Sequence, residues 1–267
     1  MGETAVHPQT GVDNMKRLSL LIIAITFYLN GAGVANIQIQ GNTINPSFNK
    51  SKKILLGQVY YDHYTTFYCG CEFSSKRQVF HTNGYEPKKQ WKRAYRLEWE
   101  HVVPAHAFGQ SFREWREGHF ECVDRKGKSF RGRNCTRKMV HKFRYMESDM
   151  YNLVPAVGEI NGLRSNYSFA MITGEKREFG QCDMEIEERK AEPPEYVRGN
   201  IARIYKYMEA AYPGHGIISK NDRNLFDTWD RQDKVDAWEC QRTKRIENIQ
   251  GNENPFVRRE CVEEGLW

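Results

Sequence analysis

The stretch Leu97-Glu98-Trp99-Glu100-His101-Val102-Val103-Pro104 decides how the rest of the chain is interpreted. Its alternating side chains predict a β-strand with His101 on one face and Glu100 on the other. Pro104 has no backbone N–H and restricts the residue before it, so regular structure should end there. At a strand end the alternation relaxes, and the two side chains could converge on one site. A carboxylate that binds a hard metal ion and an imidazole that accepts a proton are requirements of a hydrolase.

The alternative interpretation of this stretch is purely structural. His101 would be a buried histidine with a satisfied ring, and Glu100 would be a solvated charge. Nothing within the eight residues themselves decides between the two interpretations. Other segments of the chain are needed for that.

The second informative segment spans residues 146–168. Pro155 is typical of the first turn of a helix, and a helix from that position places Asn161 and Arg164 on one face. An amide oxygen and a guanidinium would then share a surface. The alternatives are that Asn152 is a turn or capping residue, and that Asn161-Gly162 marks the end of a helix.

The composition predicts a globular protein with a sizeable core. The chain has 267 residues, many aromatic side chains and a formal net charge of +6. A positive balance fits a polyanionic partner, although only weakly. The sequence contains no internal repeat, no Gly-rich phosphate loop and no Gly-x-Ser-x-Gly motif, so nucleotide-binding and serine-hydrolase classes are not indicated.

The N-terminal residues 1–35 have the features of an extension followed by a signal peptide. Met15-Lys16-Arg17 begins a positive region, residues 18–29 are apolar, and small residues lead to a cleavage point after Ala35. Met15 is the expected start, and an uncleaved anchor is the rival interpretation. We expect a periplasmic or secreted protein, with no membrane contact after cleavage and a single folded domain over residues 36–267.

The cysteines all follow the predicted signal peptide, and an oxidising compartment favours disulfides. On proximity alone, Cys122 would pair with Cys135 and Cys240 with Cys261. The total of seven is odd, so one thiol should be free or should pair between molecules. Residues 116–145, around the first pair, are rich in Lys, Arg and Gly with aromatics interleaved. Such a loop suits phosphate and base contact, and its alternative is a solvated, disulfide-braced loop.

Periodicity predicts a mixed α+β domain. The segment 36–49 should be a loose leader, and a strand should end in the opening stretch. Beyond Ser219, a good helix N-cap, we expect one bent helix or two successive helices. The remaining predicted elements are helices at 48–63, 105–115 and 197–212 and strands at 65–73 and 167–172.

The chain resembles the bacterial secreted and periplasmic endonuclease I family, which are nonspecific nucleases with a ββα-metal site. The combination of Glu98-Trp99-Glu100-His101-Val102-Val103-Pro104 with Gly158-Glu159-Ile160-Asn161-Gly162 is specific. Matching runs span nearly the whole exported region, and the further ones are Phe67-Tyr68-Cys69-Gly70-Cys71, Trp238-Glu239-Cys240 and Asn254-Pro255-Phe256-Val257.

The resemblance implies one α+β domain built around a ββα-metal motif and braced by disulfides, with one Mg²⁺ ion. It implies cleavage of DNA, and often of RNA, by a protein expected to be a monomer. His101 matches the family's general base, and Glu100 and Asn161 match its metal ligands. An arginine of the basic disulfide loop contacts the scissile phosphate in the family. Arg133 is the choice for that arginine and Arg131 the alternative, because the loop is one residue shorter than the family pattern.

A further departure lies in the run Thr82-Asn83-Gly84-Tyr85, where the family pattern has a cysteine in place of Asn83. This accounts for the odd number of cysteines and leaves either Cys69 or Cys71 without its partner.

Two other functions stay open. A non-catalytic secreted nucleic-acid-binding protein would not need Glu100, His101 and Asn161 together. A metallohydrolase for small phosphate esters would not need an extended basic surface.

Overall fold

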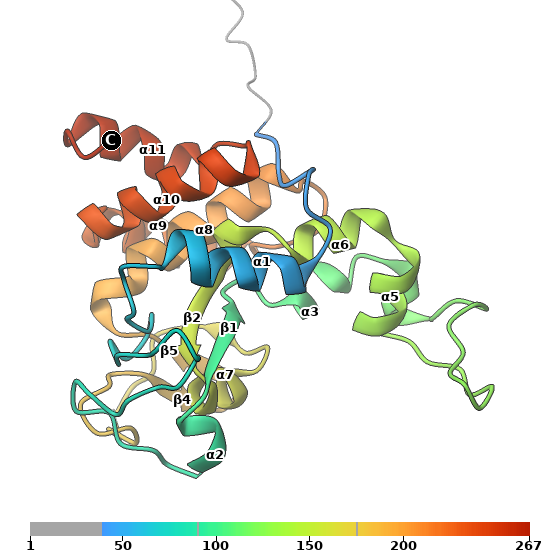
Figure 1. The fold of residues 1–267 in the computed structure, drawn as a ribbon, viewed down its shortest axis with the longest axis horizontal. Coiled ribbons are helices and arrows are strands. Elements are labelled where there is room, and N and C mark those ends of the chain that lie inside the picture. The colour runs from blue at the N-terminus through green and yellow to red at the C-terminus, as the bar shows by residue number, and fades with distance from the viewer. Residues whose placement is uncertain (1–38, 90, 175) are drawn as a thin grey trace, which may run out of the picture. The chain divides into compact units, whose positions relative to one another are not determined.

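The computed structural model describes residues 39–89, 91–174 and 176–267, which form helices and short strands in mixed order (Figure 1). The helices are α1 (Phe48–Ile54), continued by a π-helical turn (Leu55–Val59), α2 (Trp91–Ala94), α3 (Ala105–Gly109), α4 (Arg113–Arg116), α5 (Arg133–Met139), α6 (His141–Glu147), α7 (Gly158–Arg164), α8 (Arg198–Ala211), α9 (Arg223–Gln232), α10 (Ala237–Gln250) and α11 (Pro255–Glu263). Short 3-10 turns cover Met150–Asn152 and Glu195–Val197. The strands are β1 (Leu97–His101), β2 (Leu153–Val157), β3 (Ser168–Phe169), β4 (Glu185–Glu187) and β5 (Lys190–Glu192).

Strand β1 is the predicted strand of the opening stretch, and it pairs with β2 in an antiparallel ribbon in which His101 lies opposite Leu153. The ribbon ends at this pair. The Asn152 side chain accepts a hydrogen bond from the Val103 N–H at 2.7 Å and donates one to the Val103 carbonyl at 2.9 Å. Pro104 then precedes helix α3. Asn152 therefore fastens the end of β1 as the last residue of a 3-10 turn, so the turn alternative is confirmed and the capping alternative is wrong.

Pro155 lies inside β2, so the prediction that a helix begins there is wrong. Its carbonyl accepts a hydrogen bond from the Phe67 N–H at 2.8 Å. The N and C=O of one strand residue point to the same side, so the missing N–H of Pro155 faces away from β1 and costs no ladder bond. Proline is consequently tolerated in this strand, and helix α7 begins three residues later.

Helix α7 follows β2 directly and contacts both strands of the ribbon. Its first residue is Gly158, where a Cβ atom would lie 2.7 Å from the Arg93 carbonyl oxygen, so only glycine allows this close approach. The helix runs through Asn161 and Gly162 to Arg164, so Asn161-Gly162 is not a helix end. Together β1, β2 and α7 form a strand–strand–helix unit.

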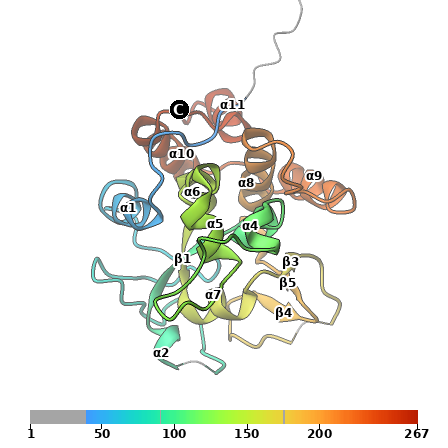
Figure 2. The ribbon, with the colours of Figure 1, turned by 90° about the vertical axis from the view of Figure 1, so that its right-hand side faces the viewer.

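The other elements surround this unit. Figure 2 shows α1 on one side of β1 and the small sheet, in the order β3-β5-β4, on the other, with α8 to α11 gathered at one end. Arg242 of α10 anchors that end, because its guanidinium donates to the Tyr60 hydroxyl and to the Met150 and Leu153 carbonyls at 2.9 Å. The described residues form one disulfide-braced α+β domain, as predicted.

Three further predicted elements differ from the structure. Residues 65–73 form turns with isolated bridges instead of a strand. The predicted helix at 105–115 is broken into α3 and α4, because the chain turns after Gly109 to bring the Trp115 ring against it, where a Cβ atom would lie 2.3 Å away. The predicted strand at 167–172 shortens to β3. The helix predictions at 48–63 and 197–212 are confirmed, as are two successive helices after Ser219. The prediction of Ser219 as the N-cap is wrong, because α9 begins at Arg223 with Asp222 as its N-cap, and Ser219 Oγ instead accepts a hydrogen bond from the Asp222 N–H.

The segment before α1 is not loose over its described part. The backbone N–H of Asn42 donates to the Tyr212 hydroxyl at 2.8 Å, and its side chain donates to the carbonyls of Asn45 and Tyr145. The predicted extension and signal peptide lie outside the described residues, so they and the boundary after residue 35 stay predictions. In the described part of the chain, no helix is long and apolar enough to cross a membrane.

Three disulfides brace the domain. The predicted pairs Cys122–Cys135 and Cys240–Cys261 are confirmed. The third joins Cys69 to Cys182, 113 positions apart, which leaves Cys71 as a buried thiol. Asn83 lies beside this bridge, and its amide donates to the Cys69 carbonyl at 3.0 Å. The cysteine without its family partner is therefore Cys71.

Candidate active site

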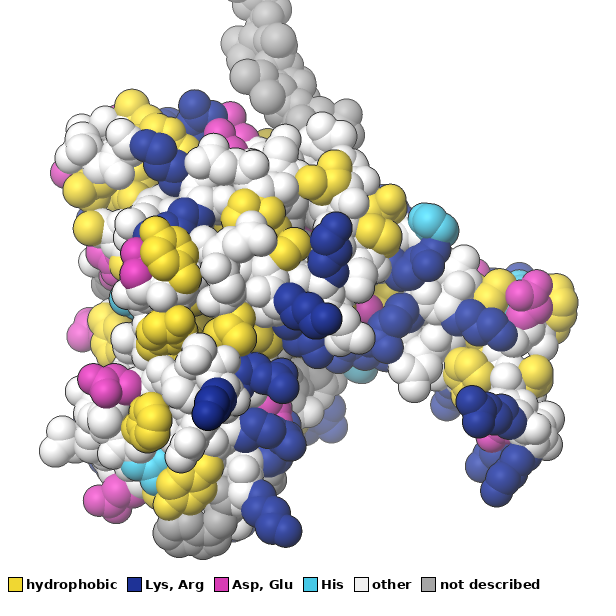
Figure 3. Space-filling view, in the orientation of Figure 1, with side chains coloured by type: hydrophobic (Ala, Val, Ile, Leu, Met, Phe, Trp, Pro, Cys, Tyr) yellow, Lys and Arg dark blue, Asp and Glu magenta, His cyan; other side chains and the backbone are white. Residues whose placement is uncertain are grey.

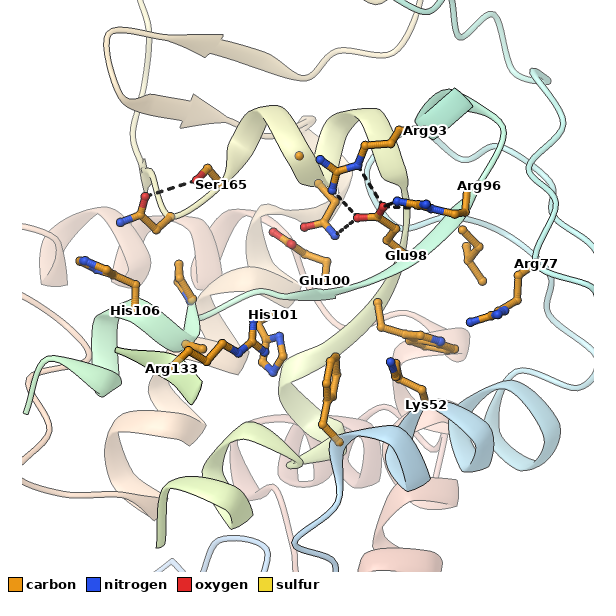
Figure 4. A pocket seen from close by; sticks show the side chains of 18 of the residues that line it. Lys52, Arg77, Arg93, Arg96, Glu98, Glu100, His101, His106, Arg133 and Ser165 are labelled. Atoms are coloured by element: carbon orange, nitrogen blue, oxygen red, sulfur yellow. Dashed lines mark hydrogen bonds and ion pairs between the residues drawn. The ribbon is translucent and has the colours of Figure 1, made fainter. Parts of the chain in front are cut away.

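A pocket of about 900 Å³ opens beside the end of β1. Figure 4 shows its side chains arriving from β1, α1, α2, α3, α5 and α7. Glu100, His101, Arg133 and Asn161 all line it, so the structure brings the four predicted site residues together. Arg131, the alternative to Arg133, lies outside it and donates to the Arg116 carbonyl at 3.1 Å.

The His101 ring is held in one orientation. Its Nε2 lies 2.8 Å from the backbone carbonyl oxygen of Glu147, and the Phe48 ring packs against it at 4.8 Å between centroids. A carbonyl can only accept a hydrogen bond, so Nε2 carries the hydrogen and Nδ1 has the free lone pair. Burial, and then the positive charge of Arg133, lowers the pKa of His101 to about 3. The ring is therefore neutral near pH 7.

Arg133 is positioned by the same residue that holds His101. The Arg133 Nε donates to the buried carboxylate of Glu147. Arg137 donates to that carboxylate as well, through Nε at 2.6 Å and Nη2 at 2.5 Å. The buried Nη2 of Arg133 has no hydrogen-bond partner among the described residues. Arg133 thus reaches the pocket with its buried Nη2 unused.

Glu100 is 2% exposed and is fixed from one side. Its Oε1 accepts hydrogen bonds from Arg164 Nη1 at 2.7 Å and from the Tyr68 hydroxyl at 3.3 Å. Arg164 is fully buried and also donates to the backbone carbonyls of His101 and Val102. None of the described residues donates to Oε2 of Glu100. One carboxylate oxygen is therefore anchored and the other is available to a ligand.

The amide of Asn161 is oriented by Glu98. Asn161 Nδ2 donates to Glu98 Oε2 at 2.8 Å, which leaves Asn161 Oδ1 as the free acceptor, because a carboxylate only accepts. Glu98 also accepts from Arg93 and Arg96, as the dashed lines in Figure 4 show. Burial alone would raise the pKa of Glu98, but these two guanidinium groups hold the pKa below its ordinary value. Glu98 is charged near pH 7 and keeps the amide in place.

The free oxygen atoms of Glu100 and Asn161 suit a hard divalent cation as ligands. Glu100 Oε2 and Asn161 Oδ1 are oxygen atoms of two residues that line the same pocket. Mg²⁺ is typically held by one or two carboxylates, several waters and substrate phosphates, without a full cage of protein ligands. The described ranges contain no cluster of three or more His, Cys, Asp or Glu side chains placed for a metal ion. The predicted pair of ligands therefore fits Mg²⁺ chemically.

The pocket is also strongly cationic. In the space-filling view, Lys and Arg side chains gather on the face that carries it (Figure 3). Burial, and then the charges of Arg77 and Arg133, lower the pKa of Lys52. Like charges crowded in this way favour an anionic ligand. The basic side chains that line the pocket are Lys52, Lys76, Arg77, Arg93, Arg96 and Arg133.

Sequence reasoning missed the residues that support the site. Glu147 and Glu98 fall in segments that the sequence singled out, but nothing local showed that each would hold a functional side chain. Arg164 was predicted to share a surface with Asn161, and this is wrong. Its guanidinium turns into the core to neutralise Glu100, and it lies 4.4 Å above the Phe169 ring.

Known proteins resemble this chain over most of its length. The model of the endonuclease I family matches residues 47–261. An extracellular deoxyribonuclease of Aeromonas hydrophila is 45% identical over 213 residues, which cover 77% of this chain and 87% of that protein. A periplasmic deoxyribonuclease of the same organism is 44% identical over 77% of this chain and 83% of its own length. Endonuclease-1 of Buchnera aphidicola subsp. Acyrthosiphon pisum (strain APS) is 39% identical, with 73% and 74% covered. The chain belongs to the endonuclease I family.

Proposed function

We propose that this protein is a periplasmic or secreted Mg²⁺-dependent endonuclease that hydrolyses phosphodiester bonds of DNA, and of RNA, without strong sequence preference. The related deoxyribonucleases support DNA as the substrate. The observation that carries the proposal is the pairing of His101 Nε2 with the Glu147 carbonyl, since it leaves Nδ1 of a neutral imidazole as the proton acceptor.

His101 acts as the general base. Its Nδ1 takes a proton from a water molecule while the water oxygen attacks phosphorus and the bond to O3′ breaks. Protonation of O3′ from solvent completes the reaction. The fixed ring loses little orientational freedom when the substrate binds, because Glu147 and Phe48 already hold it.

Arg133 binds a non-bridging oxygen of the scissile phosphate. Its unused Nη2 supplies a donor that would otherwise remain buried without a partner. A charge-assisted hydrogen bond from a guanidinium suits an oxyanion in both charge and geometry. The Glu147 carboxylate keeps Arg133 beside His101 rather than free in solvent.

Glu100 and Asn161 would hold the metal ion through the two oxygen atoms described above. When bound, Mg²⁺ would neutralise charge on the phosphate and on the leaving oxygen. Arg164 and Glu98 orient these ligands, so their geometry does not depend on the ion. The remaining cations of the pocket contact phosphates, which carry no base sequence, and this makes cleavage largely sequence-blind.

The test is cleavage of supercoiled plasmid and of structured RNA by the purified, oxidised protein, with Mg²⁺ and with EDTA. We expect nicking and then fragmentation with Mg²⁺ and neither with EDTA. A gel-shift measurement of DNA binding on the same samples distinguishes the nuclease from a non-catalytic nucleic-acid-binding protein. DNA binding without cleavage under any divalent cation would favour a non-catalytic nucleic-acid-binding protein and contradict the proposal.

A further inference from the structure

Between α4 and α5 the chain forms a loop, residues 118–131, that stands away from the body of the domain (Figure 1). We call this loop the arm. Every residue from Val123 to Ser129 is exposed, so the arm owes little to packing on the core. It contains four Lys or Arg side chains and two acidic ones. Neither the catalytic roles nor the metal site uses these residues.

The arm nevertheless has a defined shape. The disulfide Cys122–Cys135 closes it. At its tip, Asp124 Oδ1 accepts hydrogen bonds from the backbone N–H groups of Lys126 at 2.8 Å and Lys128 at 2.9 Å, and the Asp124 N–H donates to the Lys128 carbonyl at 2.9 Å. A preformed surface loses little conformational entropy when it binds a partner. The tip of the arm is thus ordered for contact although its residues from Val123 to Ser129 are all exposed.

The base of the arm joins the edge of the catalytic pocket. The Gly132 N–H donates to the Trp115 carbonyl at 3.1 Å, and Arg131 donates to the Arg116 carbonyl. Trp115 and Arg133 both line the pocket. A polyanion seated on Arg133 therefore passes the base of the arm.

The tip presents three cations to solvent. The side chains of Arg125, Lys126 and Lys128 make no hydrogen bond or ion pair with any residue that the structure describes. Figure 3 shows that a concave space separates the arm from the body, with Lys and Arg side chains on both of its walls. Positive charge on two facing walls suits a substrate that carries phosphates on two sides.

We propose that the arm is a second contact surface for the nucleic-acid substrate and that its tip binds the phosphate backbone of a duplex, beyond the phosphate being cut. This inference rests on the proposed function. A single strand can follow one wall, whereas a duplex offers two backbones.

The test compares the variant Arg125→Gln/Lys126→Gln/Lys128→Gln with a matched control, Lys220→Gln/Lys244→Gln/Arg259→Gln. The control removes the same charge from exposed positions that do not line the pocket. Binding of a labelled duplex with uncleavable phosphorothioate linkages is measured by fluorescence anisotropy over a range of salt concentrations in EDTA. A single strand of the same sequence and length serves as the second probe.

The arm variant should bind the duplex about tenfold more weakly than the unaltered protein, and the slope of log Kd against log salt should fall by about one per lost contact. Binding of the single strand and hydrolysis of bis(p-nitrophenyl) phosphate should stay unchanged. Duplex affinity equal to that of the control would overturn the proposal, as would an equal loss for the single strand. If the unaltered protein binds the duplex but cuts no nucleic acid, the proposed function is overturned. The comparison of duplex binding between the arm variant and the control would still test the role of the arm.

Discussion

His101 Nε2 lies 2.8 Å from the backbone carbonyl oxygen of Glu147, and the carboxylate of the same glutamate holds Arg133. One buried residue therefore fixes both the ring that accepts a proton and the guanidinium that meets the phosphate. The backbone carbonyl of Glu147 positions His101, and its side-chain carboxylate positions Arg133. This division makes the two contributions separable by mutation.

Glu147→Gln should separate them, because the backbone contact to His101 survives while the ion pair with Arg133 is lost. We expect kcat/KM for plasmid cleavage to fall by about tenfold to a hundredfold, in the range of a misplaced positioning group. The matched control is Arg137→Gln, which breaks the other ion pair of Glu147 but lies outside the pocket. Equal losses in the two variants would mean that the ion-pair network matters only for stability.

Asn161→Ala and Glu100→Ala should each raise the Mg²⁺ concentration needed for half-maximal activity, because each removes one oxygen ligand. Mg²⁺ titrations of activity, together with calorimetry of Mg²⁺ binding, measure the shift. Asn166→Ala is the control, since Asn166 also lines the pocket and has an amide but is assigned no ligand role. Titrations that coincide with that of the unaltered protein in both variants would place the metal elsewhere.

Arg164→Met should destabilise the fold as well as the site, because it leaves the carboxylate of Glu100 buried without its partner. Removal of one member of a buried ion pair costs about 3–5 kcal/mol, whereas Arg96→Met, at a side chain that is 60% exposed, should cost less than about 1 kcal/mol. Urea unfolding of the two variants measures the difference. Similar midpoints would show that Arg164 is not required to neutralise Glu100.

The disulfide Cys122–Cys135 should matter for activity through Arg133, two positions before Cys135. Cys122→Ser/Cys135→Ser and Cys240→Ser/Cys261→Ser open loops of 13 and 21 positions, each worth about 3 kcal/mol in the chain-entropy model. Both double variants should lose comparable stability, but only the first should lose most of its activity at a temperature where both are folded.

A Cys71→Ser background prevents exchange by the one free thiol among the described residues. Burial raises the pKa of Cys71 to about 11, so little thiolate is present near pH 7. Full activity of the Cys122→Ser/Cys135→Ser variant would contradict a role for this bridge in placing Arg133.

Local rules predicted that β1 would end before or at Pro104 and that Asn161 would lie on a helix, because both depend on neighbours in the chain. Contacts distant in sequence decided the rest. Pro155 is acceptable in β2 only because its carbonyl meets Phe67 on the side away from β1. Arg164 turns inward because Glu100, 64 positions earlier, needs a counter-charge. The periodicity of side chains cannot reveal either of these long-range contacts. The family resemblance indicated the site residues but not the residues that hold them in place.

The most direct test of the central claim is the kinetics of His101→Ala beside His106→Ala. Both histidines line the pocket, but His101 is buried against the Glu147 carbonyl and His106 is exposed. With duplex DNA and saturating Mg²⁺ near pH 7, loss of the general base should lower kcat by about 10²–10⁴-fold, with DNA affinity and Tm retained, while His106→Ala stays within about threefold of the unaltered protein. A His101→Ala variant that cuts DNA within about tenfold of the unaltered rate would contradict the account.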